Sequence, residues 1–201
     1  MNRFLFISCL FFLTCSADPD KFEYLRSPKK AVISEFNRPN LLFGMAEDKE
    51  FFAKIEDGVY HFRFSDTKNK HIKSLFTIAY DGDFEIEASV SGNKDKPESY
   101  IGIALTDLNE GEDFIESSVN WKDSFAVANQ EKWIMYSNGN QNITSKFQIL
   151  TIRKVGSDLF FFKNGVFKYQ HKIGTIKSFK VAISTGNSGR GAIDYFKIIR
   201  Y

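Results

Sequence analysis

Hydrophobic and polar residues alternate along most of the chain after residue 40. The clearest run is 83–91, where Phe84, Ile86 and Ala88 share one face of an extended strand and Glu85 and Glu87 share the other. Such runs end at turn residues, and the Asn164-Gly165 pair is typical of a two-residue β-hairpin turn. The pattern predicts roughly a dozen short strands. They cover residues 52–56, 59–64, 75–80, 83–91, 100–105, 125–128, 132–137, 146–154, 159–163, 166–171, 179–184 and 192–200.

These strands predict an all-β fold class. Turn residues separate them at the spacing typical of a sandwich or barrel, and helical periodicity is hard to find after residue 40. The chain contains 22 Phe residues, many of them on the apolar side of an alternating run. Two antiparallel sheets packed face to face would bury these side chains most simply.

The first residues predict an export signal rather than part of the fold. Arg3 precedes an apolar run over 4–13, which is about ten residues and too short to span a bilayer. In one interpretation, residues 1–17 form a signal peptide that is cleaved after Ala17. Residues 18–40 would then be a tether and edge segment that leads into a sandwich over residues 41–201.

A second interpretation of the export signal stays open beside the first. Residues 12–15 resemble a lipobox, so that 1–14 would be a lipoprotein signal and Cys15 the lipidated residue. Both cysteines of the chain, Cys9 and Cys15, lie in this segment, so the domain has no internal disulfide. A cysteine-free exported domain favours a bacterial envelope, and we expect a protein that is secreted or anchored there by lipid.

Charge narrows the range of ligands. The chain has 27 Lys and Arg residues against 25 Asp and Glu residues in a length of 201, which gives a formal net charge of +2. This balance gives no basis for a nucleic-acid-binding groove, and no nucleic-acid partner is expected. It favours neutral sugars over phosphates as ligands.

Four segments resemble the concanavalin A-like lectin/glucanase superfamily. They are 55–60 (IEDGVY), 83–88 (DFEIEA), 150–165 (LTIRKVGSDLFFFKNG) and 192–198 (AIDYFKI). The order of the segments is similar to that in laminarinase-related glycoside hydrolases and laminin G-like modules, and the resemblance covers about residues 51–201. It implies a jelly-roll sandwich of two curved antiparallel sheets whose concave face often binds carbohydrate.

The resemblance does not extend to catalytic residues. Laminarinase-type enzymes use a Glu-x-Asp-x-x-Glu strand, in which paired carboxylates act as nucleophile and acid. Here Glu85 and Glu87 share a strand face, but Val90 stands at the third position of the motif. We therefore expect a solvent-facing strand and no catalytic residues.

Aromatic and amide residues in the middle of the chain are the candidate ligand-binding residues. They are Asn120, Trp121, Trp133, Tyr136 and Asn138. Sugars present apolar C–H faces beside hydroxyl groups, so aromatic rings together with amides suit them. The alternative is that the two Trp side chains fill the sandwich core, which the alternation of Trp133 with Met135 favours.

No cofactor is expected. A carboxylate cluster in a predicted loop is of a kind that binds calcium, although charged loops are more often simply solvated. Its members are Glu110, Glu112, Asp113 and Glu116. The three histidines are scattered along the chain without metal-ligand spacing, which indicates surface or cross-strand roles. They are His61, His71 and His171.

Together these observations predict an exported or lipid-anchored, non-catalytic binding module for carbohydrate or another cell-surface ligand. Its contact with a membrane would be only through the lipid anchor. A glycoside hydrolase with an atypical carboxylate site and a structural envelope protein remain as alternatives.

Overall fold

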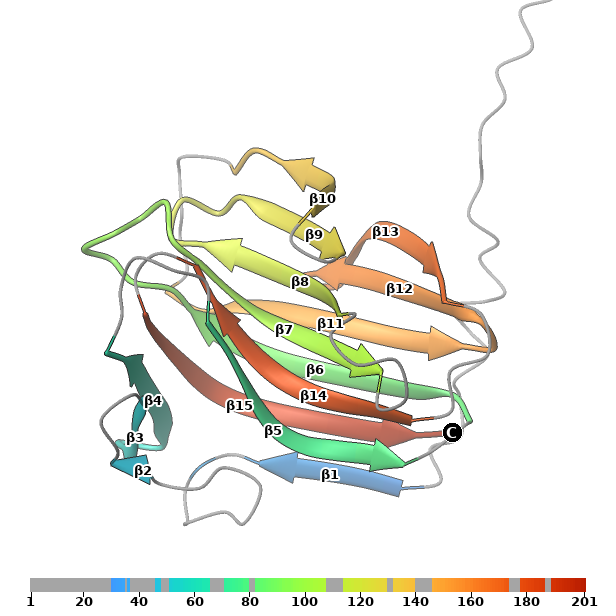
Figure 1. The fold of residues 1–201 in the computed structure, drawn as a ribbon, viewed down its shortest axis with the longest axis horizontal. Helices are drawn as coiled ribbons and strands as arrows, with labels where there is room; N and C mark the ends of the chain where they lie inside the picture. Colours follow the sequence, from blue (N-terminus) through green and yellow to red (C-terminus); the bar gives the residue numbers. More distant parts are fainter. Residues whose placement is uncertain are drawn as a thin grey trace, which may run out of the picture.

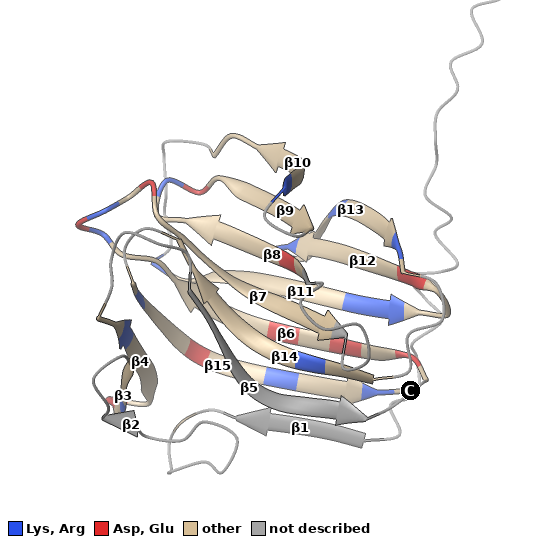
Figure 2. Ribbon diagram, viewed as in Figure 1, with Lys and Arg blue, Asp and Glu red and all other residues tan. Residues whose placement is uncertain are grey.

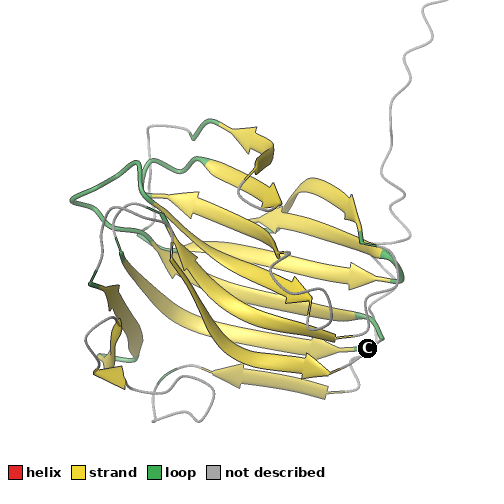
Figure 3. Cartoon of the chain, viewed as in Figure 1, coloured by secondary structure: helices red, strands yellow, loops and turns green. Residues whose placement is uncertain are grey.

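The computed structural model describes residues 30–34, 36, 46–47, 51–65, 71–79, 82–107, 114–129, 132–139, 146–173, 178–186 and 189–201. Within these ranges the chain forms strands joined by turns and loops (Figure 3). No helix in these ranges has the length and hydropathy to cross a membrane. The predicted export signal and Cys15 lie outside the described residues, as do Glu110, Glu112 and Asp113.

Nine of the described strands form one sheet (Figure 1). Their order is β13-β12-β11-β6-β15-β4-β3-β2, and β1 also pairs with β15. Their bounds are β1 Lys30–Ser34, β2 Ala46–Glu47, β3 Phe51–Glu56, β4 Val59–Phe64, β6 Phe84–Ser91, β11 Gln148–Val155, β12 Asp158–Lys163, β13 Val166–Lys172 and β15 Arg190–Arg200.

Six further described strands form the second sheet, in the order β10-β9-β8-β7-β14-β5. Their bounds are β5 His71–Ala79, β7 Tyr100–Asp107, β8 Phe114–Asn120, β9 Phe125–Asn129, β10 Lys132–Ser137 and β14 Ser178–Thr185. All the pairings in both sheets are antiparallel. Figure 1 shows this sheet lying over the nine-stranded one, so the architecture is the predicted two-sheet jelly-roll sandwich.

The core lies between the two sheets and is built from the apolar side of each alternating strand. Phe84, Ile86 and Ala88 of β6 are fully buried, as the alternation predicts. From the facing sheet, Phe179 of β14 meets Phe84 edge to face with ring centroids 5.5 Å apart. Many of the Phe side chains therefore form the core between the two sheets.

The two-residue turns have the geometry that their sequence predicts. Asn164 and Gly165 both take positive φ values, of 50° and 75°, between β12 and β13. The Asn164 side chain also accepts a hydrogen bond from the backbone N–H of Ile149 at 2.8 Å, which joins this turn to β11. The Asp57-Gly58 turn between β3 and β4 has the same pair of positive φ values, 52° and 73°.

The structure adds strands that the sequence pattern did not predict. β8 was missed because Ser117 points toward the core between Ile115 and Val119 and so interrupts the apolar alternation. β1 lies within residues 18–40, which were predicted as a tether and edge segment, and pairs with the second half of β15. β5 begins at His71, earlier than the predicted run over 75–80.

Candidate functional site

Three aromatic side chains form an exposed cluster beside β10, called here the aromatic patch. Trp133 and Tyr136 are 53% and 52% exposed, which sets them apart from the buried rings of the core. Their ring centroids lie 6.0 Å apart at an interplanar angle of 86°. The third ring, Tyr100 of β7, lies 5.0 Å from Trp133. The patch is therefore a corner of nearly perpendicular rings open to solvent.

A β-bulge produces this exposure. Trp133 pairs with Ala128, whereas Met135 pairs with Val127, so the register shifts between Trp133 and Met135. The extra residue places Trp133 and Tyr136 on the outer face, while Met135 packs against the core. The alternative that Trp133 fills the core together with Met135 is thus wrong, because simple alternation fails at the bulge.

The outer face of the six-stranded sheet beside this patch carries small side chains. Those on β7, β8, β9 and β14 are buried: Gly102, Ala104, Ser118, Ala126, Ala128, Ala182 and Ser184. Pairing places Trp133, Ala128, Glu116 and Ala104 in one row across four strands. Glu116 is 4% exposed, so this carboxylate lies within the sheet, and the prediction that it belongs to a loop is wrong.

Tyr100 is held in place at the edge of the patch. Hydroxyl groups of Tyr136 and Ser124 lie within hydrogen-bonding reach of its own hydroxyl. Burial, followed by the hydrogen bond with Tyr136, raises the pKa of Tyr100 well above its usual value. The phenol therefore stays protonated and can donate a hydrogen bond at any ordinary pH.

The two predicted asparagines have different surroundings. Asn120 is 2% exposed, and its Oδ1 accepts a hydrogen bond from the Ser124 backbone N–H at 3.0 Å. The Asn120 backbone carbonyl accepts a further bond from Gln148 Nε2 at 3.1 Å. Asn120 therefore stabilises the turn after β8. Asn138 is exposed and follows Tyr136 by two residues in the chain, just after the end of β10.

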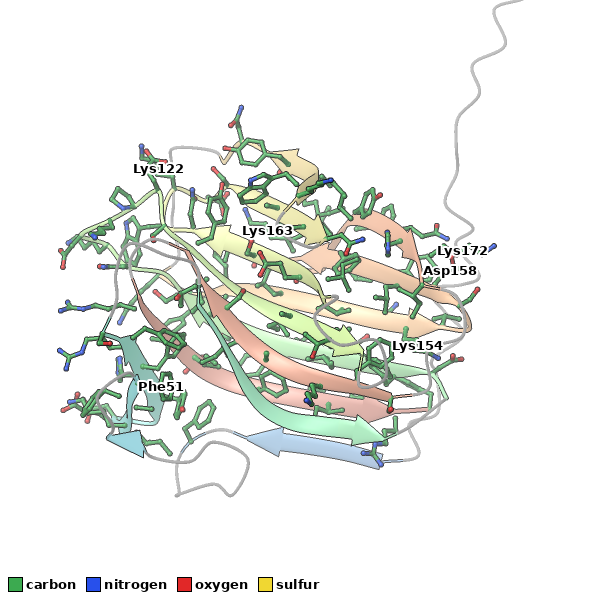
Figure 4. The ribbon with its side chains drawn as sticks, viewed as in Figure 1. Phe51, Lys122, Lys154, Asp158, Lys163 and Lys172 are labelled. Carbon is green, nitrogen blue, oxygen red and sulfur yellow. The ribbon has the colours of Figure 1, made fainter. Side chains whose placement is uncertain are left out.

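Trp121 belongs to a different region from Trp133 and Tyr136. It sits in the β8–β9 turn, which an ion pair of 2.6 Å between Lys163 Nζ and Asp123 Oδ1 holds against the nine-stranded sheet. Figure 4 labels Lys163 and Lys122, the residue of the turn that follows Trp121. Trp121 lines a pocket of about 600 Å³, called here the basic pocket. The pocket is lined by Phe52, Lys54, Glu56, His61, Phe62, Arg63, Ser91, Gly92, Asn93, Lys94, Trp121, Lys146, Arg190, Gly191 and Ala192.

The sequence did not reveal the basic pocket. Its residues come from β3, β4, the end of β6 and the loop after it, the β8–β9 turn, the segment just before β11 and the start of β15, which are far apart along the chain. The one local signal is the alternation of His61 and Arg63 with Tyr60 and Phe62, which puts the basic residues on the outer face.

Glu85 and Glu87 lie on the outer face of the nine-stranded sheet, each in contact with a partner. Glu85 is 7% exposed, with its Oε2 2.6 Å from Arg153 Nη2, so the expectation that it faces solvent is wrong. Glu87 accepts a hydrogen bond from the Tyr195 hydroxyl at 3.0 Å. Burial and the Glu87 charge raise the pKa of Tyr195. These contacts tie both carboxylates into the sheet.

The described residues contain no group of three or more His, Cys, Asp or Glu side chains able to hold a metal ion. His61 lies opposite Lys54 across β3 and β4, in a cross-strand position. Burial is the main cause that lowers the pKa of both His61 and His171. The side chain of His71 lies outside the described residues.

Comparison with known proteins places the chain by its fold. No family model matches it, and no curated protein matches it. A Bacillus subtilis protein of unknown function with a galectin-like fold superposes with a TM-score of 0.65 at 6% identity, over 87% of this chain and 97% of that one. A glycoside hydrolase family 16 endo-glucanase from Bacteroides ovatus gives 0.57 at 10% identity, over 83% and 99%.

A third structure agrees with these two. The laminarinase catalytic domain from Thermotoga maritima gives a TM-score of 0.54 at 13% identity, over 77% of this chain and 82% of that one. At such identities the likeness establishes the fold alone. The expected resemblance is confirmed, because the chain forms a jelly-roll sandwich of the concanavalin A-like kind.

Proposed function

We propose that this jelly-roll domain binds carbohydrate without cleaving it, and that the aromatic patch is its binding surface. The observation that carries the proposal is the exposure of Trp133 and Tyr136 as adjacent, nearly perpendicular rings. Large rings exposed together on a folded domain commonly mark an interaction site. The Tyr136 hydroxyl and the amide of exposed Asn138, two residues later in the chain, would form hydrogen bonds with sugar hydroxyls.

The fold and the contacts of Glu85 and Glu87 support a binding role. Among the similar structures, one is named a laminarinase catalytic domain and another an endo-glucanase, so both names are those of enzymes that act on polysaccharides. In this chain, Glu85 and Glu87 are engaged by Arg153 and Tyr195. Neither carboxylate is free to act as the nucleophile or acid of a glycosidase without breaking these contacts.

The proposal is tested by a glycan array with the purified protein, followed by calorimetry on the best glycan. Trp133→Ala should weaken binding at least about tenfold, or ~1.4 kcal/mol, because it removes the stacking surface. Val166→Ala is the matched control, since Val166 is also exposed, at 57%, and lies on β13 of the other sheet. Failure to bind any glycan, or equal affinity of Trp133→Ala and the parent, would contradict the proposal.

A glycoside hydrolase remains the second candidate because of Glu116. This carboxylate lies in the same cross-strand row as Trp133, separated from it by Ala128. Incubation with β-glucans distinguishes the two functions. Binding without release of reducing ends supports the binding module. Turnover that Glu116→Gln abolishes, with folding intact by circular dichroism, would make the domain a hydrolase.

Export is the remaining part of the proposal. It rests on the basic residue and apolar run at the start of the sequence, followed by Cys15 and Ala17. Intact-mass measurement of the protein from the cell envelope and medium tests it. Loss of residues 1–17 supports secretion, whereas loss of 1–14 with an acylated Cys15 supports a lipid anchor. A full-length mass in the cytoplasm would contradict export.

A further inference from the structure

The basic pocket has a strong excess of positive charge. Lys54, Arg63, Lys94, Lys146 and Arg190 all line it, and Glu56 is the single carboxylate among the described residues that line it. The whole chain has a net charge of only +2, so cationic side chains are concentrated here rather than spread evenly. Figure 2 shows Lys and Arg positions on β4, on the loop after β6 and at the start of β15, at the same end of the sandwich.

The single carboxylate does little to neutralise the pocket. Glu56 Oε2 lies 2.6 Å from Lys54 Nζ at the surface, and this hydrogen bond is the main cause that lowers the pKa of Glu56. That pairing accounts for one of the five cations. Arg63, Lys94 and Lys146 have no ion pair with a carboxylate among the described residues.

The backbone register brings like charges together. Arg63 of β4 and Arg190 of β15 are direct cross-strand partners, on the outer face of the sheet. Like charges directly opposite each other destabilise a sheet. The Arg63 guanidinium also lies over the Phe52 ring, 5.4 Å from its centroid, and this contact fixes its position at the pocket wall. A bound anion would relieve the repulsion.

We propose that the basic pocket binds the sulfate or carboxylate groups of an acidic polysaccharide, with Trp121 stacking against a sugar ring. The saccharide nature of the ligand rests on the proposed function, whereas its negative charge rests on the pocket alone. Arg63 supplies a planar fork of donors that matches a carboxylate or sulfate, and Lys94 and Lys146 add point charges. A pocket of about 600 Å³ is within the range of small-ligand sites.

The pocket therefore changes the expectation drawn from net charge. Near neutrality of the whole sequence favoured neutral sugars, because a composition averages over the surface. The fold gathers Arg63, Lys146 and Arg190 from distant segments into one cavity. In this arrangement, the aromatic patch would contact sugar rings of a polysaccharide, and the basic pocket would give the domain a preference for acidic polysaccharides.

The test uses the purified protein with heparin, polygalacturonate and neutral laminarin as probes. Both acidic polysaccharides should bind at about 50 mM salt and weaken at least about tenfold at about 500 mM, since salt screens charge attraction. The variant Arg63→Gln/Lys94→Gln/Lys146→Gln should bind both acidic polysaccharides with an affinity at least about tenfold lower than that of the parent. The control Lys168→Gln/Lys172→Gln/Lys180→Gln removes the same charge outside the pocket and should bind as the parent does.

The outcomes separate the two proposals. If the pocket variant loses affinity for acidic polysaccharides and Trp133→Ala does not, the pocket is supported as the binding site and the aromatic patch is contradicted as one. Equal binding by pocket and control variants, with both folded by circular dichroism, overturns the pocket proposal. Equal affinity for single-stranded DNA or for anionic phospholipid vesicles of matched charge also overturns it, because the site would then be a general anion surface.

Discussion

Arg153 of β11 lies directly across from Glu85 of β6, with its Nη2 2.6 Å and its Nε 2.8 Å from the same carboxylate oxygen. The Arg153 guanidinium also covers the Phe162 ring, 4.9 Å from the centroid. The side chains of Arg153 and Glu85 are 19% and 9% exposed, so water screens this pair weakly. On the outer face of the nine-stranded sheet, the pair joins β6, β11 and β12.

Removal of this pair should destabilise the fold. We expect Glu85→Gln to lower the free energy of unfolding by about 2 kcal/mol, because it leaves a largely buried guanidinium without its counter-charge. Urea unfolding measures the change. Glu98→Gln is the control, since the Glu98 side chain pairs with Lys122 and is 73% exposed. This substitution should change the free energy of unfolding by less than about 0.5 kcal/mol. Similar losses in the two variants would show that the Arg153 contact is not structural.

Gly102 leaves no room for a side chain on the six-stranded sheet. A Cβ there would lie 2.4 Å from the Ser117 carbonyl oxygen and 2.7 Å from the Ser118 Cβ. We expect Gly102→Ala to cost at least ~2 kcal/mol by overpacking. Gly92→Ala is the contrast, because its Cβ would meet its nearest neighbour at 3.5 Å. Thermal unfolding of both variants checks this, and an unchanged melting temperature for Gly102→Ala would mean that β7 and β8 can separate locally.

The exposed and buried rings should differ sharply in their contribution to stability. Phe161 is fully buried, and Phe161→Ala should cost about 3–5 kcal/mol through lost burial and a cavity. Trp133→Ala should cost less than about 1 kcal/mol, since half of Trp133 is already in water. Guanidinium unfolding measures both. A large loss for Trp133→Ala would mean that this ring holds β10 in place and would weaken its assignment to ligand binding.

Acid should destabilise the protein through its histidines. The folded pKa of His61 and of His171 lies below the ordinary value of 6.5, because burial disfavours the charged ring. The unfolded chain therefore takes up more protons, and stability is full above pH 6.5 and falls as pH drops toward the lowered pKa values. We expect His61→Asn/His171→Asn to flatten the loss of stability between about pH 7 and pH 5.5.

This pH dependence is measured by urea unfolding at a series of pH values. Exposed Lys172→Gln is a suitable control, because it should leave the slope unchanged. An equally steep slope in the double histidine variant would assign the acid sensitivity to carboxylates instead.

Most strands and their inward faces could be predicted from the sequence, because a period of two in hydrophobicity can be read residue by residue, although β8 was missed where Ser117 interrupts it. The Asn164-Gly165 turn follows just as locally, since positive φ at both positions favours these two residues. Which aromatic rings face water depends on the pairing of strands in three dimensions. A β-bulge with one extra residue lies between Trp133 and Met135, and the alternation of hydrophobic and polar residues does not predict the position of a bulge. Likewise, only pairing between distant strands places Arg63 against Arg190, because the attraction of a pocket for anions depends on distances in space rather than along the chain.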